Sequence, residues 1–210
     1  MTVDDSFAQK VTLTEVKLNE HIAGIKQQYT QRYGDKAGSG VYSRYDWARV
    51  SYVFDLLHKG GRVLDVGVGS GQFVNALAMS GSFPEIVGVD VTTHTKFIRL
   101  TDAYELQHMS VAELRFPTDS FDVVVCMEVL EHIDRRTFLA GLRELRRVCR
   151  DQLVMTVPFD EPLPLPSYHK QRFDQTSITE LWPTASRQLL QRPGVSWLLM
   201  EETRPVVMDA

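Results

Sequence analysis

From Arg62 onward, short runs of Val, Ile and Leu alternate with segments whose apolar residues recur at helical spacing. The strand-like runs are RVLDV (62–66), EIVGVD (85–90), AYELQHMS (103–110), FDVVVCME (121–128) and DQLVMTVPF (151–159). QFVNALAMS (72–80) and the Arg-rich stretch 134–149 have the period of amphipathic helices, whereas TKFIRLT (95–101) reads as a short helix or a turn. Strands that alternate with helices predict a parallel sheet covered by helices on both faces.

Both ends of the chain follow different patterns. Residues 6–33 predict one or two amphipathic helices and 44–58 predict another, on either side of the small-residue break GDKAGSG. After a Pro-rich loop and a helix near 174–182, the segments 187–191 and 195–203 predict two strands around a tight turn. These two strands would form an antiparallel hairpin at the edge of the sheet.

The overall composition narrows the class of protein. The 210 residues carry a formal net charge of −4, which disfavours a nucleic-acid partner because such partners usually require a basic face. No apolar run is long enough to span a bilayer, and the start of the chain lacks the apolar core of a secretory signal. Two cysteines in apolar surroundings indicate a reducing compartment, so we expect a cytoplasmic protein without membrane contact.

The segment DVGVGSG interrupts the pattern where the first strand of this series gives way to a helix. Glycines at 67, 69 and 71 permit positive φ angles and let a ligand approach the backbone. In a parallel sheet, ligands bind at this carboxyl edge of the strands, although a tight turn without a ligand is the alternative. The spacing G-x-G-x-G fits neither the dinucleotide fingerprint G-x-G-x-x-G nor a phosphate-binding Walker loop.

Asp65 to Gly71 resembles motif I, E/D-x-G-x-G-x-G, of the class I S-adenosylmethionine-dependent methyltransferases. Two further segments of that family follow in order: an acid, Asp90, after the second strand, and SVAELRFPTDSFDVVVCMEVLEHI (110–133). The resemblance implies an α/β, Rossmann-like three-layer sandwich with a mostly parallel seven-stranded sheet and an antiparallel C-terminal hairpin. It also divides the single domain into an N-terminal helical cap or lid, residues 1–58, and a methyltransferase core, residues 59–210.

The resemblance further implies S-adenosyl-L-methionine as the cofactor. Asp90 would accept the ribose hydroxyls, and Ser110 stands where the family usually has an Asp that reaches the adenine, so that contact would fall to backbone groups. Asp65 would organise the turn and the amino-acid end of the cofactor. The full set of expected cofactor-binding residues is Asp65, Gly67, Gly69, Gly71, Asp90, Val91, Ser110, Val111, Ala112, Met127 and Glu128.

Methyl transfer to a hydroxyl benefits from a general base, for which histidine suits neutral pH. His132 in the Leu-Glu-His segment and His169 in the loop PSYHKQRF are the candidates, and no metal ligand set stands out. A surface histidine and an ordinary polar loop are the alternatives. For the acceptor site and the lid we expect Tyr33, Tyr42, Arg44, Tyr45, Tyr168 and Arg172, although the aromatic side chains could instead pack helices on the sheet.

The expected function is therefore methylation of a small-molecule acceptor, a sugar or a natural-product intermediate, with oxygen favoured over nitrogen or carbon. One alternative is RNA or protein methylation, which the Arg-rich helix 135–150 favours. Methylation of a base amino group would require a motif such as Asn-Pro-Pro-Tyr after the fourth strand. Residues Met127 to Leu130 occupy that position instead, so methylation of bases is disfavoured. Another alternative is a non-catalytic binding module with the methyltransferase fold, which keeps the cofactor pocket or serves as a partner subunit. The acceptor and the oligomeric state stay open.

Overall fold

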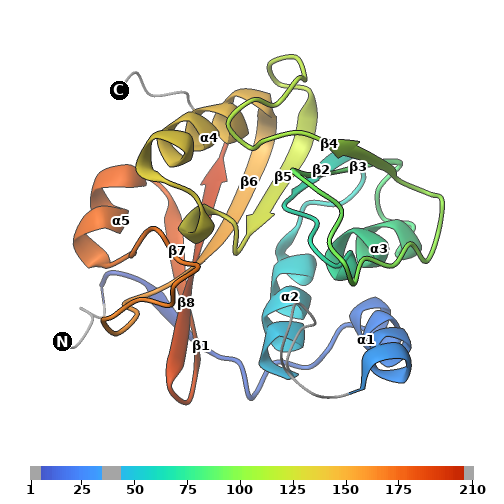
Figure 1. Ribbon diagram of the computed structural model, residues 1–210, viewed down its shortest axis with the longest axis horizontal. Coiled ribbons are helices and arrows are strands. Elements are labelled where there is room, and N and C mark those ends of the chain that lie inside the picture. Colours follow the sequence, from blue (N-terminus) through green and yellow to red (C-terminus); the bar gives the residue numbers. More distant parts are fainter. Residues whose placement is uncertain (1–5, 35–43, 206–210) are drawn as a thin grey trace.

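A computed structural model describes residues 6–34 and 44–205 of the chain (Figure 1). In this part, eight strands form one sheet in the order β1-β7-β8-β6-β5-β2-β3-β4. The strands are β1 (Gln9–Thr12), β2 (Arg62–Val66), β3 (Glu85–Asp90), β4 (Glu105–His108), β5 (Phe121–Met127), β6 (Cys149–Pro158), β7 (Ser186–Arg192) and β8 (Val195–Thr203). The helices are α1 (Glu20–Tyr33), α2 (Arg44–Leu56), α3 (Gln72–Met79), η1 (Leu130–His132), α4 (Arg135–Val148) and α5 (Gln175–Leu181).

The sheet is mostly parallel. Strand β8 runs antiparallel to β6 and β7, and the other neighbouring strands pair in parallel, which confirms the predicted C-terminal hairpin at one side of a parallel sheet. The hairpin does not end the sheet, however, because β1 adds to β7 as a further parallel strand.

The sheet thus has one strand more than the seven predicted, and the extra strand comes from a segment predicted to be helical. Val11 and Leu13 stand two residues apart, which is the period of a strand, and the helical period begins only with Ile22 and Ile25 in α1. Hydrogen bonding to the open edge of β7, continued by the Leu13 amide on the Gln191 carbonyl at 2.9 Å, decides the conformation of this short segment.

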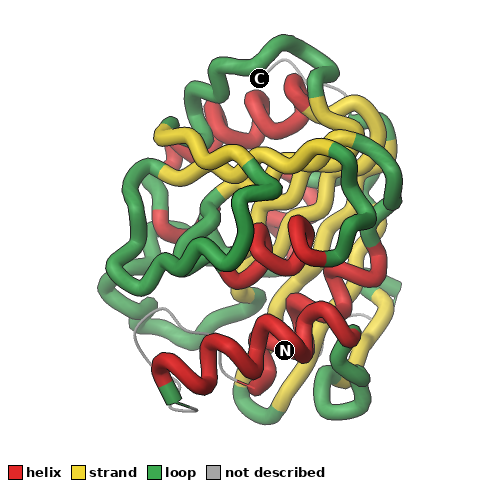
Figure 2. The backbone as a smooth tube through the Cα atoms, turned by 90° about the vertical axis from the view of Figure 1, so that its right-hand side faces the viewer, coloured by secondary structure: helices red, strands yellow, loops and turns green. Residues whose placement is uncertain are grey.

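Helices cover both faces of the sheet, so the structure has the three layers that were predicted (Figure 2). Side chains of β5 alternate between the two faces: Val124 and Cys126 pack with α4 and α5, whereas Val123 and Val125 pack with α1, α2 and α3. This period-two alternation between two apolar layers explains why the strand has an almost continuous apolar sequence.

The parallel arrangement places the carboxyl ends of β2, β3, β5 and β6 along one edge of the sheet. The glycine turn follows β2, Asp90 ends β3, and Glu128 follows β5 at this edge. In the described part of the chain, no helix has the length and apolar character that crossing a bilayer would require.

Candidate functional site

The glycine turn between β2 and α3 depends on backbone conformations that favour glycine. Gly67, Gly69 and Gly71 have φ angles of 82°, 54° and 91°. A Cβ atom on Gly67 would lie 2.1 Å from Cγ2 of Val129, and one on Gly71 would lie 3.0 Å from the carbonyl oxygen of Ile98. The nearest atom to a Cβ on Gly69 would be 3.9 Å away, so space remains beside the middle of the turn.

Asp90 ties the end of β3 to this turn. Its Oδ2 accepts a hydrogen bond from the Gly69 amide at 2.8 Å, and its Oδ1 accepts one from the Thr92 amide at 3.4 Å. Each carboxylate oxygen has a second lone pair, so Asp90 keeps acceptor capacity for a ligand hydroxyl. The side chain of Val91, the next residue, is exposed.

Asp65 is a buried acid beneath the turn. Its side chain is 3% exposed, and its Oδ2 has no hydrogen-bond partner among the described residues. Burial, and secondarily the nearby Asp90 carboxylate, raises the pKa of Asp65 to about 7. An unpartnered buried carboxylate is costly, so this position suits a ligand group that donates hydrogen bonds or carries positive charge.

Residues 110–112 lie beside Asp90, because the Met109 amide donates to the Asp90 carbonyl at 3.1 Å. Ser110 uses its hydroxyl to accept from the Ala112 amide at 3.2 Å. The Val111 side chain is buried against Gly141 of α4, so its side chain cannot face a ligand at the carboxyl edge. Backbone groups of this segment are left for any contact there.

Helix α1 supports the glycine turn from the N-terminal side. The hydroxyl of Tyr29 donates to the Ser70 carbonyl at 2.6 Å, and Asn75 of α3 donates to the Gly71 carbonyl at 2.7 Å. Tyr33 is partly buried and donates to the Lys96 carbonyl at 3.3 Å. Tyr29 was not among the predicted site residues, although its position four residues after Ile25 places it on the buried face of the helix.

Three of the predicted lid residues cannot be placed. Tyr42 lies outside the described residues. Arg44 and Tyr45 begin helix α2, but their side chains are also outside the described part of the structure.

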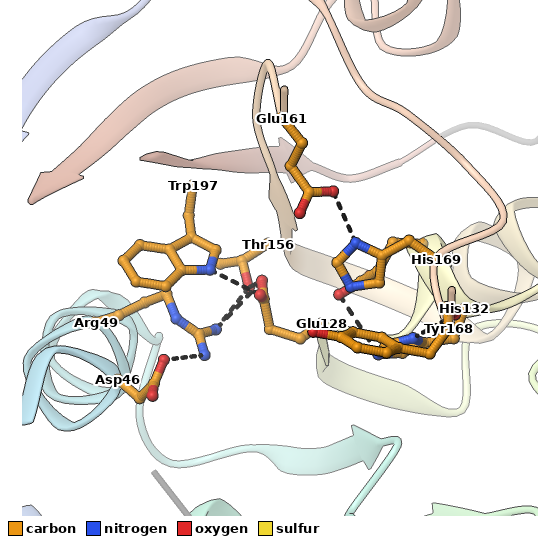
Figure 3. Close-up of polar contacts among 10 residues, drawn as sticks. Asp46, Arg49, Glu128, His132, Thr156, Glu161, Tyr168, His169 and Trp197 are labelled. Carbon is orange, nitrogen blue, oxygen red and sulfur yellow. Dashed lines mark hydrogen bonds and ion pairs between the residues drawn. The ribbon is translucent and has the colours of Figure 1, made fainter. Parts of the chain in front are cut away.

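Glu128 follows β5 and is held by a partly buried polar network (Figure 3). Its Oε1 accepts from the Thr156 hydroxyl at 3.0 Å and lies 3.4 Å from Nη1 of Arg49, while its Oε2 accepts from Nε1 of Trp197 at 2.7 Å. Asp46 pairs with the same guanidinium at 3.5 Å. Burial raises the pKa of Glu128, and the positive charge of Arg49 opposes that shift.

This network joins helix α2 to the carboxyl ends of β5, β6 and the hairpin. Arg49 is 2% exposed and was not predicted to take part in the site. No sequence motif marks it, because its partners other than Asp46 lie about 80 to 150 positions further along the chain. Glu128 itself has an unusual φ of 56°, which the surrounding contacts hold in place.

The two predicted histidines meet in space (Figure 3). His132 ends η1 and His169 lies in the loop after β6, yet their ring centroids are 5.1 Å apart. His132 Nδ1 is 3.2 Å from the Tyr168 carbonyl, and His169 Nδ1 is 2.7 Å from Oε2 of Glu161. The exposed Tyr168 ring packs edge-on against His169 at 4.7 Å.

Glu131 completes this group and was not among the predicted site residues. Its side chain is 1% exposed, and its Oε1 lies 3.7 Å from His132 Nε2. Burial, with a further contribution from Glu128, holds the pKa of Glu131 well above its usual range. Glu131 lies in the Leu-Glu-His segment that already pointed to the acceptor site. Its burial, which distinguishes it from a surface acid, could not be predicted from the sequence.

Arg172 was predicted to contact the acceptor, but its guanidinium braces its own loop. It pairs with Asp160, with Asp174 at 2.9 Å, and with the Glu161 carbonyl at 3.0 Å. These contacts hold the two ends of the loop after β6 together and thereby fix the position of His169.

Some known proteins are similar to part of this sequence, and others share its fold. Residues 64–154 match a family model described as a methyltransferase domain. The ubiquinone biosynthesis O-methyltransferase of Haemophilus ducreyi is 38% identical over 85 residues, which cover 35% of each chain. That of Psychrobacter arcticus is 37% identical over 83 residues, which cover 35% of this chain and 32% of the relative. The chain thus matches about a third of the length of these curated relatives.

Solved structures of similar fold cover far more of the chain. The cyclase SpnF has a TM-score of 0.61 at 15% identity, and the match covers 95% of this chain and 98% of that one. The 1,6-didemethyltoxoflavin-N1-methyltransferase of Burkholderia thailandensis, crystallised with S-adenosylhomocysteine, has a TM-score of 0.58 at 17% identity, over 92% of this chain and 80% of that one. These similarities show the fold alone, since one of the two proteins is named a cyclase and the other an N-methyltransferase.

Proposed function

We propose that this chain is a class I S-adenosylmethionine-dependent methyltransferase that transfers a methyl group from S-adenosylmethionine to a hydroxyl of a small molecule. The match of residues 64–154 to a methyltransferase domain supports this proposal. The cofactor would supply an electrophilic methyl group on its sulfonium. The residues of this chain would bind both reactants in line, which by itself can provide much of the acceleration.

The carboxyl edge of β2 and β3 supports the cofactor part of the proposal. S-adenosylmethionine carries an ammonium group and a ribose with two hydroxyls. The unpartnered, buried carboxylate oxygen of Asp65 suits the ammonium group, and the acceptor capacity left on Asp90 suits the ribose. The space beside Gly69 would let the cofactor lie against the backbone. In the same proposal, Met127 and Glu128 flank its methionine part.

The observation that carries methylation of oxygen is the pair formed by His169 and Glu161. The Glu161 carboxylate accepts from Nδ1 of His169 at 2.7 Å, which fixes the ring and leaves Nε2 to take a proton from an acceptor hydroxyl. Glu161 would also stabilise the resulting imidazolium. The similarity to the ubiquinone biosynthesis O-methyltransferases agrees with this choice of atom.

A macromolecular acceptor has less support. Arg146 of the Arg-rich helix α4 is buried and bound to Glu202 at 2.5 Å and 2.9 Å, and Arg147 binds Glu144 and two backbone carbonyls. These guanidinium groups are engaged within the chain, so the helix offers less free positive charge than its sequence indicates. We further propose that residues 1–58 act as a cap over the cofactor, since α1 contacts the glycine turn through Tyr29.

The proposal is tested in two steps. Calorimetry first measures binding of S-adenosylmethionine and S-adenosylhomocysteine. If neither binds, the chain shares only the fold of the methyltransferases and the proposal is wrong. Phenols and sugar alcohols are then assayed for release of S-adenosylhomocysteine. We expect His169→Ala to reduce turnover by roughly 10²- to 10⁴-fold, with cofactor affinity unchanged.

His58→Ala is the matched control. His58 also pairs with a carboxylate, Asp151 at 3.0 Å, but it lies at the opposite edge of the sheet, where β6 begins. Its loss should leave turnover unchanged. Equal turnover by the His169→Ala variant and the native chain on the best acceptor would rule out the assigned base.

A further inference from the structure

We infer that Glu131, His132 and His169 form a binding site for a divalent cation of the zinc type. Each residue offers one ligand atom, and these atoms lie within 4.8 Å of one another. The first two residues come from η1 and the third from the loop after β6, so the fold assembles the group from two separate segments. This inference goes beyond the proposed function and does not depend on it.

The hydrogen bond of His132 determines which of its ring nitrogens is free. Nδ1 lies 3.2 Å from the carbonyl oxygen of Tyr168, which can only accept, so Nδ1 carries the proton. In the neutral ring, Nε2 therefore presents a lone pair, and it lies 3.7 Å from Oε1 of Glu131. Two electron-rich atoms that face each other at this distance are stabilised by a cation between them.

His169 repeats the same arrangement. Its Nδ1 lies 2.7 Å from the Glu161 carboxylate, which also only accepts, so Nε2 is again the nitrogen with a free lone pair. Histidines that bind a metal almost always donate their other N–H to a carboxylate or a backbone carbonyl, which orients the ring. His132 and His169 have one such partner each (Figure 3).

Glu131 supplies the negative charge and the independent evidence for a ligand. Its side chain is 1% exposed, and Oε2 lacks a hydrogen-bond partner within the described residues. A buried carboxylate in that condition is costly unless a cation neutralises it. The Glu131 carbonyl also accepts from the amides of Lys170 at 2.6 Å and Gln171 at 3.2 Å, which holds the loop that carries His169 against η1.

The chemistry of the three donors selects the type of ion. Two imidazoles and one carboxylate suit Zn²⁺ and its first-row neighbours, whereas Mg²⁺ and Ca²⁺ prefer oxygen ligands alone. Three protein ligands leave an open position, as in catalytic zinc sites. Zinc bonds of roughly 2.0–2.2 Å would draw the ligand atoms closer together than they now lie, by about 1 Å.

An ion at this position would occupy the lone pair that His169 would otherwise offer as a base. A hydroxyl bound at the open position would then lose its proton through the lowered pKa that coordination brings, and the proton would pass to solvent. The metal site and the methyl acceptor would in that case share one edge of the sheet.

The test measures metal binding directly, without an acceptor. The full-length chain, free of affinity tags, is stripped with a chelator and dialysed against Zn²⁺, and the bound metal is counted by mass spectrometry. Co²⁺ serves as a second probe, because its visible absorption reports coordination by imidazole. We expect one equivalent of metal per native chain, and at least 100-fold weaker binding by His132→Ala and His169→Ala.

Two further variants separate binding from folding. Glu161→Gln keeps the three ligands and should weaken binding about 10- to 100-fold. His58→Ala should bind Zn²⁺ like the native chain. Each metal-free variant is checked for native circular dichroism and for binding of S-adenosylhomocysteine, so that loss of metal is not confused with loss of the fold or of the proposed function. The inference is overturned if the native chain takes up no metal, or if uptake survives both His132→Ala and His169→Ala.

Discussion

The side chain of Val129 fills the space in which a Cβ atom of residue 67 would lie, since its Cγ2 is 2.1 Å from that position. Gly67 belongs to the glycine turn after β2, and Val129 follows β5 in the segment that leads to His132. The turn proposed to hold the cofactor and the segment proposed to hold the acceptor therefore pack directly on each other. A change at either position should affect both.

Gly67→Ala should destabilise the chain by about 2–4 kcal/mol, because a positive φ costs an L-residue roughly 1–2 kcal/mol and overpacking adds a similar amount. Cofactor binding should be lost with it. Gly81→Ala is the control, because Gly81 also has a positive φ, 64°, but has no atom within 4 Å of the added Cβ. Denaturant unfolding measures both variants, and equal losses would show that the Val129 contact does not matter.

The double variant Gly67→Ala/Val129→Ala tests the contact itself. Removing the Val129 side chain makes room for the new Cβ, so the steric part of the cost should be relieved and the backbone part should remain. A double variant that loses as much as the sum of the two single changes would contradict direct packing, because contacting residues are expected to be non-additive.

Asp65 should make stability depend on pH. Burial raises its pKa to about 7, so the folded chain holds this proton more tightly than the unfolded chain. The contribution of this protonation to the free energy of unfolding is complete below about pH 4 and is lost as the pH rises to about 7. A difference of about three pKa units corresponds to about 4 kcal/mol.

Asp65→Asn removes this loss, so the variant should unfold at higher denaturant concentration than the native chain at pH 8. The advantage should shrink at pH 5. The same variant should bind S-adenosylmethionine more weakly, because it lacks the negative charge. Asp102→Asn, at an exposed acid, should show no such pH dependence. An Asp65→Asn variant that follows the native stability curve at every pH would contradict the buried, unpartnered state.

Arg49→Met should cost about 2–4 kcal/mol, because it leaves the partly buried Glu128 carboxylate without its positive partner. The double variant Arg49→Met/Glu128→Gln should recover most of that loss. Arg150→Ala breaks an exposed ion pair with Asp122 and should cost about 0–1 kcal/mol. Similar losses from Arg49→Met and Arg150→Ala in urea unfolding would show that the network contributes little.

Tyr29→Phe should cost about 0.5–1.5 kcal/mol, because the carbonyl of Ser70 loses the hydrogen bond of 2.6 Å from the Tyr29 hydroxyl, while the longer one from the Ile98 amide, at 3.3 Å, remains. Tyr33→Phe removes a longer bond from a less buried residue and should cost less. If helix α1 acts as a cap on the glycine turn, Tyr29→Phe should also weaken binding of S-adenosylhomocysteine, as measured by calorimetry. An unchanged affinity for S-adenosylhomocysteine would show that helix α1 does not contribute to cofactor binding.

Sequence patterns predicted the central part of the fold because that information is local. The alternation of apolar runs indicated the strands from β2 to β8, and the glycines at 67, 69 and 71 marked the turn after β2. Such patterns reflect how side chains alternate about a strand or a turn, so a short window contains them. The resemblance to the methyltransferase family rested on motifs within residues 62–133.

Only the tertiary structure decided the polar groupings. The β1 strand depended on the free edge of β7, Arg49 reached Glu128 across 79 positions of the chain, and Arg172 paired with Asp160 and Asp174 of its own loop. His132 and His169 were each candidates from the sequence, but their meeting with Glu131 depended on a loop path fixed by Lys170 and Gln171 amides. A local period does not encode which distant groups meet, because that depends on packing and on buried hydrogen bonds that form only when the chain is folded.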